Sequence, residues 1–413
     1  MNILIYMLDN VKIGTEGTHI FEVLNNLSSM GHFIRYVNGK KYVPVLTREP
    51  DLHHKGDHRL SFWIHIKKFM TASSLQGEAM LLLNFLKEIR LFFLALVTVL
   101  RDKPDIIYRR HTHFNSDYVI SRLFKIPTVK EVNAIGSDEM KITKKADRFT
   151  LWLYNIIERY NLPRADRILV VTPELKESLH SEFKVELNKI TVIQNGANAD
   201  IFRPMDVKQA REKLDLNQDA HYICFVGLLE RWQGIEYLIK SLPLILDQCP
   251  DTRLLIVGDG RIKNDLVTLV EQTGVSSKVI FTGVVPYEEV PLYINAGDVC
   301  TAPFIKELNK KGGLCSLKMY EYLACGKPCV ISKLRGTETM RENHCLCLVE
   351  PENITELAQS IVALLKDREL RIAMGGNGRK YIVESQSWKK VTERVVDVCQ
   401  NLVKSRRNGN SLV

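Results

Sequence analysis

The sequence predicts an α/β protein of two domains, each built on a parallel sheet covered by helices, and three observations support this. Apolar strand segments alternate with helical patterns, and strands joined by single helices form parallel sheets through right-handed crossovers. At 413 residues, the chain exceeds what one ordinary hydrophobic core holds. The alternation loses its periodicity after Phe202-Arg203-Pro204 and then restarts, so we place the domain boundary near residue 205.

The first domain, residues 1–204, opens with a strand, a glycine loop, a helix and a second strand. A glycine loop at this place holds phosphate in Rossmann-type domains. The loop Gly14-Thr15-Glu16-Gly17 lacks the three-glycine dinucleotide spacing, which argues against a nicotinamide cofactor. The expected strands are 3–8, 33–37, 105–108, 127–132, 167–172 and 190–193, and the expected helices are 20–30, 117–124, 151–160 and one that starts at Pro173.

The second domain, residues 205–385, repeats the alternation, and a glycine follows several of its strands, at Gly227, Gly258 and Gly283. In doubly wound sheets, ligands bind at the edge formed by the carboxyl ends of the strands. The expected strands are 222–226, 253–257, 278–281, 299–302 and 328–331, and the expected helices are 235–246, 262–272, 288–295, 317–325 and 354–366.

The stretch 312–332 carries the clearest signal for a ligand. Gly312 and Gly313 precede a short helix, on which Lys318 and Glu321 lie three residues apart and therefore on the same side. A cation and a carboxylate beside a helix N-terminus suit a ligand that carries phosphate and hydroxyl groups. The alternative is a solvated ion pair on a packing helix. Because the stretch belongs to the same sheet edge as the glycine loops, we favour the ligand site.

The charge distribution bears on partners and location. The net charge is +9, and cations concentrate in the segment 40–68, which suits an anionic membrane face, a phosphorylated substrate or a solvated loop. No nucleic-acid motif accompanies this segment, so we expect no nucleic-acid partner. The apolar run 91–100 is about half a membrane span, and we expect a core helix with an interfacial edge. The nine cysteines and the lack of a secretory signal favour a reducing, cytoplasmic location.

Six sequence blocks occur in an order that is typical of one family. They are Val192–Pro204, Val226–Gly234, Ile256–Gly260, Phe281–Pro286, Leu317–Pro328 and Ser387-Trp388. With them the chain resembles the retaining, nucleotide-sugar-dependent glycosyltransferases of family four, which have the GT-B fold of two Rossmann-like domains facing across a cleft. The resemblance implies that the first domain holds the acceptor, that the second holds the donor, and that residues 386–413 form a helix crossing back to the first domain.

The resemblance also assigns roles to individual residues. Glu321 matches the family glutamate that holds the donor ribose, whereas Gly313 stands where the family has another glutamate. Leu228 and Gln233 stand where the family usually has arginine and lysine, which places more weight on Lys318 and Arg231. The donor-binding residues that the resemblance implies are Gly14, Thr15, Gly227, Gln233, Gly258, Asp259, Ser316, Leu317, Lys318 and Glu321, and the catalytic candidates are Lys318, Arg231, Asn133 and Glu131.

The expected reaction transfers a sugar, with retention, from a nucleoside diphosphate sugar to an acceptor hydroxyl. The chain has no Asp-x-Asp triplet, so we expect no metal and no cofactor, with cations and backbone N–H groups stabilising the departing diphosphate. Asn133 stands where the family often has a histidine, and Glu131 is either a general base or a member of a supporting ion pair. The expected acceptor is a lipid-linked, phosphorylated or saccharide molecule used in cell-envelope polysaccharide or glycolipid synthesis, at the inner membrane face. The alternatives are a sugar-nucleotide epimerase and a non-catalytic nucleotide-sugar binding protein.

Overall fold

The computed structural model describes residues 1–7, 18–38, 42–45, 76–111, 116–137, 147–307, 312–337 and 343–408. The chain forms two compact units: unit 1 comprises Met1–Ile193 and Thr392–Val413, and unit 2 comprises Gln194–Val391. The units therefore divide at Ile193, whereas the sequence pattern predicts a boundary near residue 205. Residues 194–204 belong to unit 2 because they pack there. The Ala197 N–H donates to the carbonyl of Gln386 at 3.0 Å, and Phe202 is fully buried in the unit-2 core.

Unit 1 is built on a seven-stranded sheet in the order β3-β2-β1-β4-β5-β6-β7. Six strands are parallel, which confirms the predicted α/β class, and β3 pairs antiparallel with β2 at the edge. Pro44 in β3 fits an edge position because proline cannot donate to a sheet ladder. The strands are β1 (Asn2–Met7), β2 (Phe33–Asn38), β3 (Tyr42–Val45), β4 (Ile106–Arg110), β5 (Thr128–Val132), β6 (Arg167–Val170) and β7 (Ile190–Val192).

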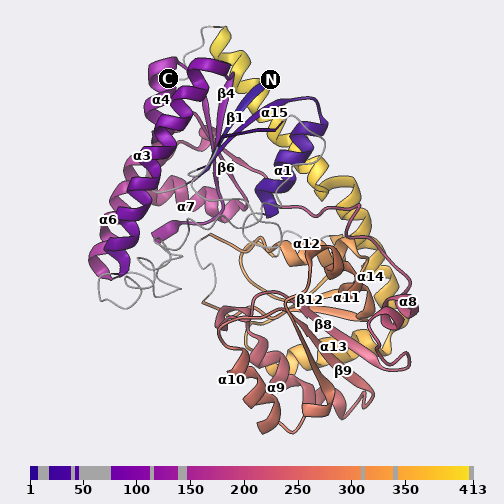
Figure 1. The fold of residues 1–413 in the computed structure, drawn as a ribbon. Helices are drawn as coiled ribbons and strands as arrows, with labels where there is room; N and C mark the ends of the chain where they lie inside the picture. The colour runs from indigo at the N-terminus through magenta and orange to yellow at the C-terminus, as the bar shows by residue number, and fades with distance from the viewer. Residues whose placement is uncertain are drawn as a thin grey trace, which may run out of the picture. The chain divides into compact units, whose positions relative to one another are not determined.

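The helices of unit 1 cover both faces of this sheet, with α3, α4 and α6 on one side and α1 and α15 on the other (Figure 1). Local chemistry fixes their starts: the Thr172 hydroxyl caps α7 and Pro173 occupies its first turn, where the missing N–H costs nothing. The helices are α1 (Thr18–Ser29), α3 (Gln76–Asp102), α4 (Ser116–Phe124), α6 (Arg148–Asn161), α7 (Pro173–Phe183) and α15 (Trp388–Arg407), with short 3₁₀ turns η2 (Leu162–Arg164) and η3 (Leu187–Lys189).

The C-terminal helix α15 lies in unit 1 from Thr392 onward, and two ion pairs hold its last turn there. Arg406 contacts Asp166 at 2.6 Å, and Arg407 contacts Asp105 at 2.7 Å. The apolar run 91–100 forms part of α3, where some residues are buried and others are exposed. No helix among the described residues is both long and apolar enough to span a bilayer.

Unit 2 is built on a six-stranded, all-parallel sheet in the order β10-β9-β8-β11-β12-β13. Successive residues of one strand point to opposite faces: Cys224 and Val226 join one hydrophobic core, and Ile223 and Phe225 join the other. The strands are β8 (His221–Val226), β9 (Thr252–Val257), β10 (Val279–Gly283), β11 (Val299–Ala302), β12 (Cys329–Ser332) and β13 (Leu346–Val349).

The helices of unit 2 follow the predicted alternation with one local difference. The segment expected as a single helix over 288–295 is a 3₁₀ turn, η6 (Tyr287–Glu289), followed by a helix with Pro291 in its first turn, where proline favours a start. The helices are α8 (Val207–Lys213), α9 (Ile235–Leu246), α10 (Lys263–Gln272), α11 (Val290–Ala296), α12 (Leu317–Ala324), α13 (Ile354–Lys366) and α14 (Arg368–Tyr381), with the turns η4 (Arg231–Gln233), η5 (Ser276–Lys278) and the π-helical η8 (Ile382–Gln386).

Candidate functional site

Two glycines at the carboxyl ends of neighbouring strands shape the candidate site of unit 2. Gly227 follows β8 with φ of +147°, and Gly258 follows β9 with φ of +133°, both in a region that side chains disfavour. A Cβ atom on Gly227 would lie 2.5 Å from the Lys318 Nζ atom, and one on Gly258 would lie 2.0 Å from the Gly227 carbonyl oxygen. Only glycine therefore allows these loops and the lysine to approach so closely.

Lys318 is the central cation of this edge. It lies in the first turn of α12, is 8% exposed, and donates to the Gln233 side-chain carbonyl at 2.6 Å. Burial lowers the pKa of Lys318 to about 7, and the Glu321 carboxylate opposes this shift. Lys318 and Gln233 are 85 residues apart in the sequence, so the fold brings together two residues that were predicted as donor-binding on separate segments. The result is a buried ammonium group held by a neutral amide.

Aromatic rings, which the sequence pattern does not indicate as site residues, complete the surroundings of this lysine. The Lys318 Nζ atom lies 4.1 Å from the centre of the Phe225 ring and 5.4 Å from that of Phe304. Trp232 stacks on Phe304 with ring centres 6.2 Å apart. Cation–π contacts of this kind stabilise a cation without neutralising its charge. Phe225 and Phe304 are apolar residues in or beside core strands, so their role was not visible from the sequence pattern.

Two hydrogen bonds fix the start of α12 against the rest of unit 2. The Asn195 side-chain amide donates to the Cys315 carbonyl at 2.8 Å, just before the N-cap residue Ser316. The buried Tyr322 hydroxyl accepts from the Val226 N–H at 2.8 Å, which ties α12 to the end of β8. Ser316 and Leu317 thus begin the helix at a defined place, and Lys318 is the second residue of the helix.

The other predicted residues of unit 2 lie around this centre with different degrees of contact. Glu321 is partly exposed one turn along α12. Asp259 accepts from Lys263 Nζ at 3.0 Å and from the Gly260 N–H, which together lower the pKa of its carboxyl group. Arg231 lies in η4, but its guanidinium is 80% exposed and pairs with Asp265 at 3.3 Å. The structure therefore brings Gln233 to Lys318, whereas the Arg231 side chain contacts α10.

In unit 1, Glu131 and Asn133 are joined at the end of β5, while Gly14 and Thr15 lie outside the described residues. The Glu131 carboxylate accepts from Tyr108 Oη at 2.5 Å and from Asn133 Nδ2 at 2.8 Å, and it pairs with His19 Nδ1 at 3.0 Å. Burial alone would raise the pKa of Glu131, but His19 and Tyr108 hold it at about 2. Such a weakly basic carboxylate favours the supporting ion pair over the general base.

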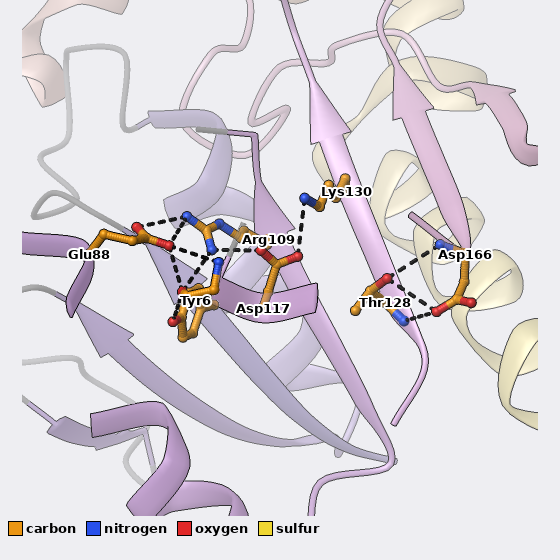
Figure 2. Close-up of polar contacts among 8 residues, drawn as sticks. Tyr6, Glu88, Arg109, Asp117, Thr128, Lys130 and Asp166 are labelled. Atoms are coloured by element: carbon orange, nitrogen blue, oxygen red, sulfur yellow. Dashed lines mark hydrogen bonds and ion pairs between the residues drawn. The ribbon is translucent and has the colours of Figure 1, made fainter. Parts of the chain in front are cut away.

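A second buried network in unit 1 was not predicted from the sequence (Figure 2). Arg109 at the end of β4 is fully buried, donating to Glu88 at 2.9 Å and to Asp117 at 2.7 Å. Lys130 of β5 reaches the second oxygen of Asp117 at 3.3 Å, and the Arg109 guanidinium lies 4.7 Å from the Tyr6 ring centre. Each of these cations therefore has a carboxylate partner within unit 1.

Metal ligation finds no support in the part of the chain that the structure describes. No group of three or more histidine, cysteine, aspartate or glutamate side chains gathers there in a way that could hold an ion. The groups that lie together at the unit-2 edge are instead a cation, an amide and a helix N-terminus. These groups suit an anion, and phosphate is the anion that helix N-termini and lysines commonly bind.

Two family models match the chain. "Glycosyltransferase Family 4" matches residues 17–201, and "Glycosyl transferases group 1" matches residues 220–367. The chain therefore belongs to the glycosyltransferases of family 4 type with the GT-B fold, as the resemblance predicted.

Among curated relatives, an uncharacterized glycosyltransferase of Methanocaldococcus jannaschii is 31% identical over 56% of this chain and 59% of its own length. A "GDP-mannose-dependent monoacylated alpha-(1-6)-phosphatidylinositol monomannoside mannosyltransferase" of Corynebacterium glutamicum is 29% identical over 48% of this chain and 52% of its own length. The chain thus spans between half and three fifths of these two relatives.

Solved structures share the whole fold at low sequence identity. A sucrose-phosphate synthase from Thermosynechococcus elongatus covers 98% of this chain and 100% of its own with a TM-score of 0.72 and 18% identity. The Anabaena protein HepE, solved in complex with UDP, covers 97% of this chain and 100% of its own with a TM-score of 0.70 and 15% identity. These likenesses confirm the GT-B architecture.

Proposed function

We propose that this chain is an enzyme that transfers a hexosyl group from a nucleoside diphosphate sugar to an acceptor hydroxyl, with retention and without a metal ion. The observation that carries the proposal is the buried Lys318 ammonium at the glycine-lined edge of the unit-2 sheet. The names of two similar proteins support the donor class, since one is GDP-mannose-dependent and the other was solved with UDP. Family membership does not favour the epimerase or the non-catalytic alternative.

The proposed chemistry depends on the departure of a charged diphosphate. The bond between the sugar and the diphosphate breaks, the acceptor oxygen forms the new bond, and negative charge grows on the leaving phosphate. A preorganised cation stabilises that charge more strongly in a low-dielectric site than in water. Lys318, which is already buried and aligned by Gln233, is the residue to which we assign this role. Glu321 is assigned to the ribose hydroxyls, one helical turn away.

The acceptor is proposed to be lipid-linked, and the protein to act at an anionic membrane surface. The C. glutamicum relative is named for a phosphatidylinositol mannoside acceptor, which is a lipid. The basic segment 40–68 belongs to the same proposal, although most of it lies outside the described residues. A role in cell-envelope polysaccharide or glycolipid synthesis would follow from such an acceptor.

The experiment that tests the function is a panel of nucleoside diphosphate sugars, measured first for thermal stabilisation and then for hydrolysis and transfer with and without EDTA. We expect one donor to stabilise the protein and to be hydrolysed slowly without acceptor, EDTA to have no effect, and proton NMR of the product to show the donor's anomeric configuration. Lys318→Met should abolish most of this activity, whereas Lys208→Met, at an exposed position on α8, should keep it. Equal activity of the two variants would contradict the assignment.

A further inference from the structure

Helix α6 presents an unusual distribution of side chains. Its buried side is mainly polar, with the fully buried Glu158 accepting from the Gly136 N–H at 2.9 Å. Its opposite side is apolar and exposed, and Trp152 is 58% exposed there. A helix of a globular protein normally buries its apolar side, so this arrangement is reversed. The exposed apolar residues follow a helical spacing and are Phe149, Trp152, Ile156 and Tyr160.

Exposed apolar residues continue on two further helices of unit 1. Helix α3 packs beside α4, and Figure 1 shows α3, α4 and α6 on the same side of the sheet. On α4, Leu123 is 66% exposed. The exposed apolar residues of the part of α3 whose side chains are described are Phe85, Leu86, Ile89, Phe93, Val97 and Leu100. Apolar side chains that gather on one side of a domain in this number are typical of an interaction site rather than of ordinary solvent-facing surface.

On the same three helices, the exposed charged side chains that the structure describes are positively charged. Among their described side chains, the carboxylates Glu88, Asp117 and Glu158 are at most 4% exposed, and that of Asp102 is 13% exposed. The N-cap residue Asp147, just before α6, is exposed and accepts from the Thr150 N–H. Within the helices, the exposed charged residues whose side chains the structure describes are all cations, namely Lys87, Arg90, Arg101, Arg122, Arg148 and Arg159.

We propose that this helical face, formed by the exposed apolar and cationic side chains of α3, α4 and α6, docks on an anionic lipid bilayer. Aromatic and aliphatic side chains enter the boundary between headgroups and acyl chains, while lysines and arginines attract anionic headgroups. A second copy of the chain fits this face poorly, because it would bring together two surfaces whose described exposed charges within the helices are positive. The inference deepens the proposed function and rests on it only for the lipid nature of the acceptor.

The proposal is tested by sedimentation of the full chain with vesicles, without any donor sugar. Wild type should bind phosphatidylcholine vesicles that contain phosphatidylglycerol, should bind pure phosphatidylcholine weakly, and should lose affinity as salt rises. The variant Arg148→Gln/Arg159→Gln should bind the anionic vesicles about thirtyfold more weakly at low salt, since each cation contributes about fivefold. The variant Trp152→Glu/Ile156→Glu should lose at least about tenfold of its affinity for the anionic vesicles.

Matched controls use unit 2. Lys208→Gln/Lys213→Gln removes two exposed cations of α8, and Ile372→Glu changes an exposed apolar residue of α14, so neither should alter vesicle binding. Thermal unfolding verifies that each variant is folded. If the Trp152→Glu/Ile156→Glu variant does not fold, the Arg148→Gln/Arg159→Gln variant alone tests the proposal. Failure of wild type to bind, or binding by both test variants equal to that of wild type, would overturn the proposal.

Further measurements distinguish membrane docking from self-association of the chain and from the proposed reaction. Light scattering that shows a dimer dissociated by Trp152→Glu/Ile156→Glu, with vesicle binding intact, would assign the face to self-association and overturn the proposal. Donor hydrolysis is measured in the same preparations, so a protein that hydrolyses donor but ignores vesicles would retain the proposed reaction and lose the docking face. Vesicle binding without donor hydrolysis would support the docking face and count against the reaction.

Discussion

Both units contain buried cations, but these cations have different partners. In unit 1, Arg109 contacts two carboxylates and Lys130 contacts one of them. In unit 2, Lys318 donates to a neutral amide and lies over two rings. The first arrangement satisfies its charges internally, which is what a structural network requires. The second leaves charge to be matched by an arriving anion, which is what a phosphate site requires.

The largest expected effect comes from breaking the internally satisfied network. Arg109→Met removes the buried cation that contacts both Glu88 and Asp117 and leaves Lys130 to contact Asp117 alone. We expect the free energy of unfolding to fall by about 3–5 kcal/mol, measured by urea titration. The exposed Arg368→Met should change it by less than about 0.5 kcal/mol. A loss below about 1 kcal/mol for Arg109→Met would show that the unit-1 network is not structural.

In unit 2, the corresponding substitution of a buried cation, Lys318→Met, should weaken donor binding without destabilising the fold. Lys318→Met removes a buried cation and supplies an apolar side chain of similar length, so the free energy of unfolding should stay constant or rise. Donor affinity should fall by about ten- to a hundredfold, since a charge-assisted hydrogen bond contributes about 1.5–3 kcal/mol. Calorimetric titration of the donor measures this. If Lys318→Met lowered the free energy of unfolding and left donor affinity unchanged, Lys318 would be structural, as Arg109 is in unit 1, and would not bind the donor.

The loss of stability at acidic pH tests the cluster that Glu131 forms with His19, Tyr108 and Asn133 in unit 1. The pKa of Glu131 is about 2 in the folded chain, which is below the ordinary pKa of a glutamate. Ionised Glu131 therefore stabilises the fold at any pH above that ordinary pKa, and this contribution disappears as the pH falls toward 2. Glu131→Gln should therefore lower the free energy of unfolding by about 1–3 kcal/mol at neutral pH. The difference from wild type should shrink on acidification. A difference that is independent of pH would exclude the ionised pair.

Donor affinity should also depend on pH through Lys318. In the empty site its pKa is lowered to about 7, and a bound diphosphate favours the protonated form. Affinity should be highest below pH 7 and should fall as pH rises above it, by at most about tenfold per unit. Lys318→Met should remove this slope. An affinity that rises with pH in wild type would contradict the assigned charge.

The smallest expected effect concerns Arg231. Its pair with Asp265 is exposed, so Arg231→Met should change the free energy of unfolding by less than about 1 kcal/mol. Because its side chain contacts α10 rather than Lys318, we expect its loss to reduce donor affinity by less than the loss of Lys318. Calorimetry on both variants makes the comparison. A larger effect for Arg231→Met would show that this side chain turns toward the donor on binding.

Much of the fold was predictable because the signals are local. The strand 299–302 and the helix 354–366 have the predicted bounds, since apolar periodicity and punctuating residues lie within the segments themselves. The edge strand β3 and the helix α14 were missed. Pro44 lowers the strand signal of β3, and three glycines at 375, 376 and 378 lower the helix signal of α14. Tertiary packing decided both elements.

The candidate site was predictable only in part, for a related reason. Lys318, Glu321 and the glycines stand out because ionisable groups and glycines interrupt apolar segments. The network of Glu88, Arg109 and Asp117 joins residues on three elements, and nothing in the sequence pattern pairs them. The ring beneath Lys318 was hidden for the same reason, since Phe225 is indistinguishable from a core residue until the fold places it.

Proton uptake on donor binding tests the central claim most directly. Calorimetric titration of the donor at pH 7, in buffers with different ionisation enthalpies, measures the number of protons taken up. Because the pKa of Lys318 in the empty site is about 7, wild type should take up a measurable fraction of a proton, and Lys318→Met should take up none. Equal uptake by the two proteins, or release of protons by wild type, would contradict the claim that the donor diphosphate meets this lysine.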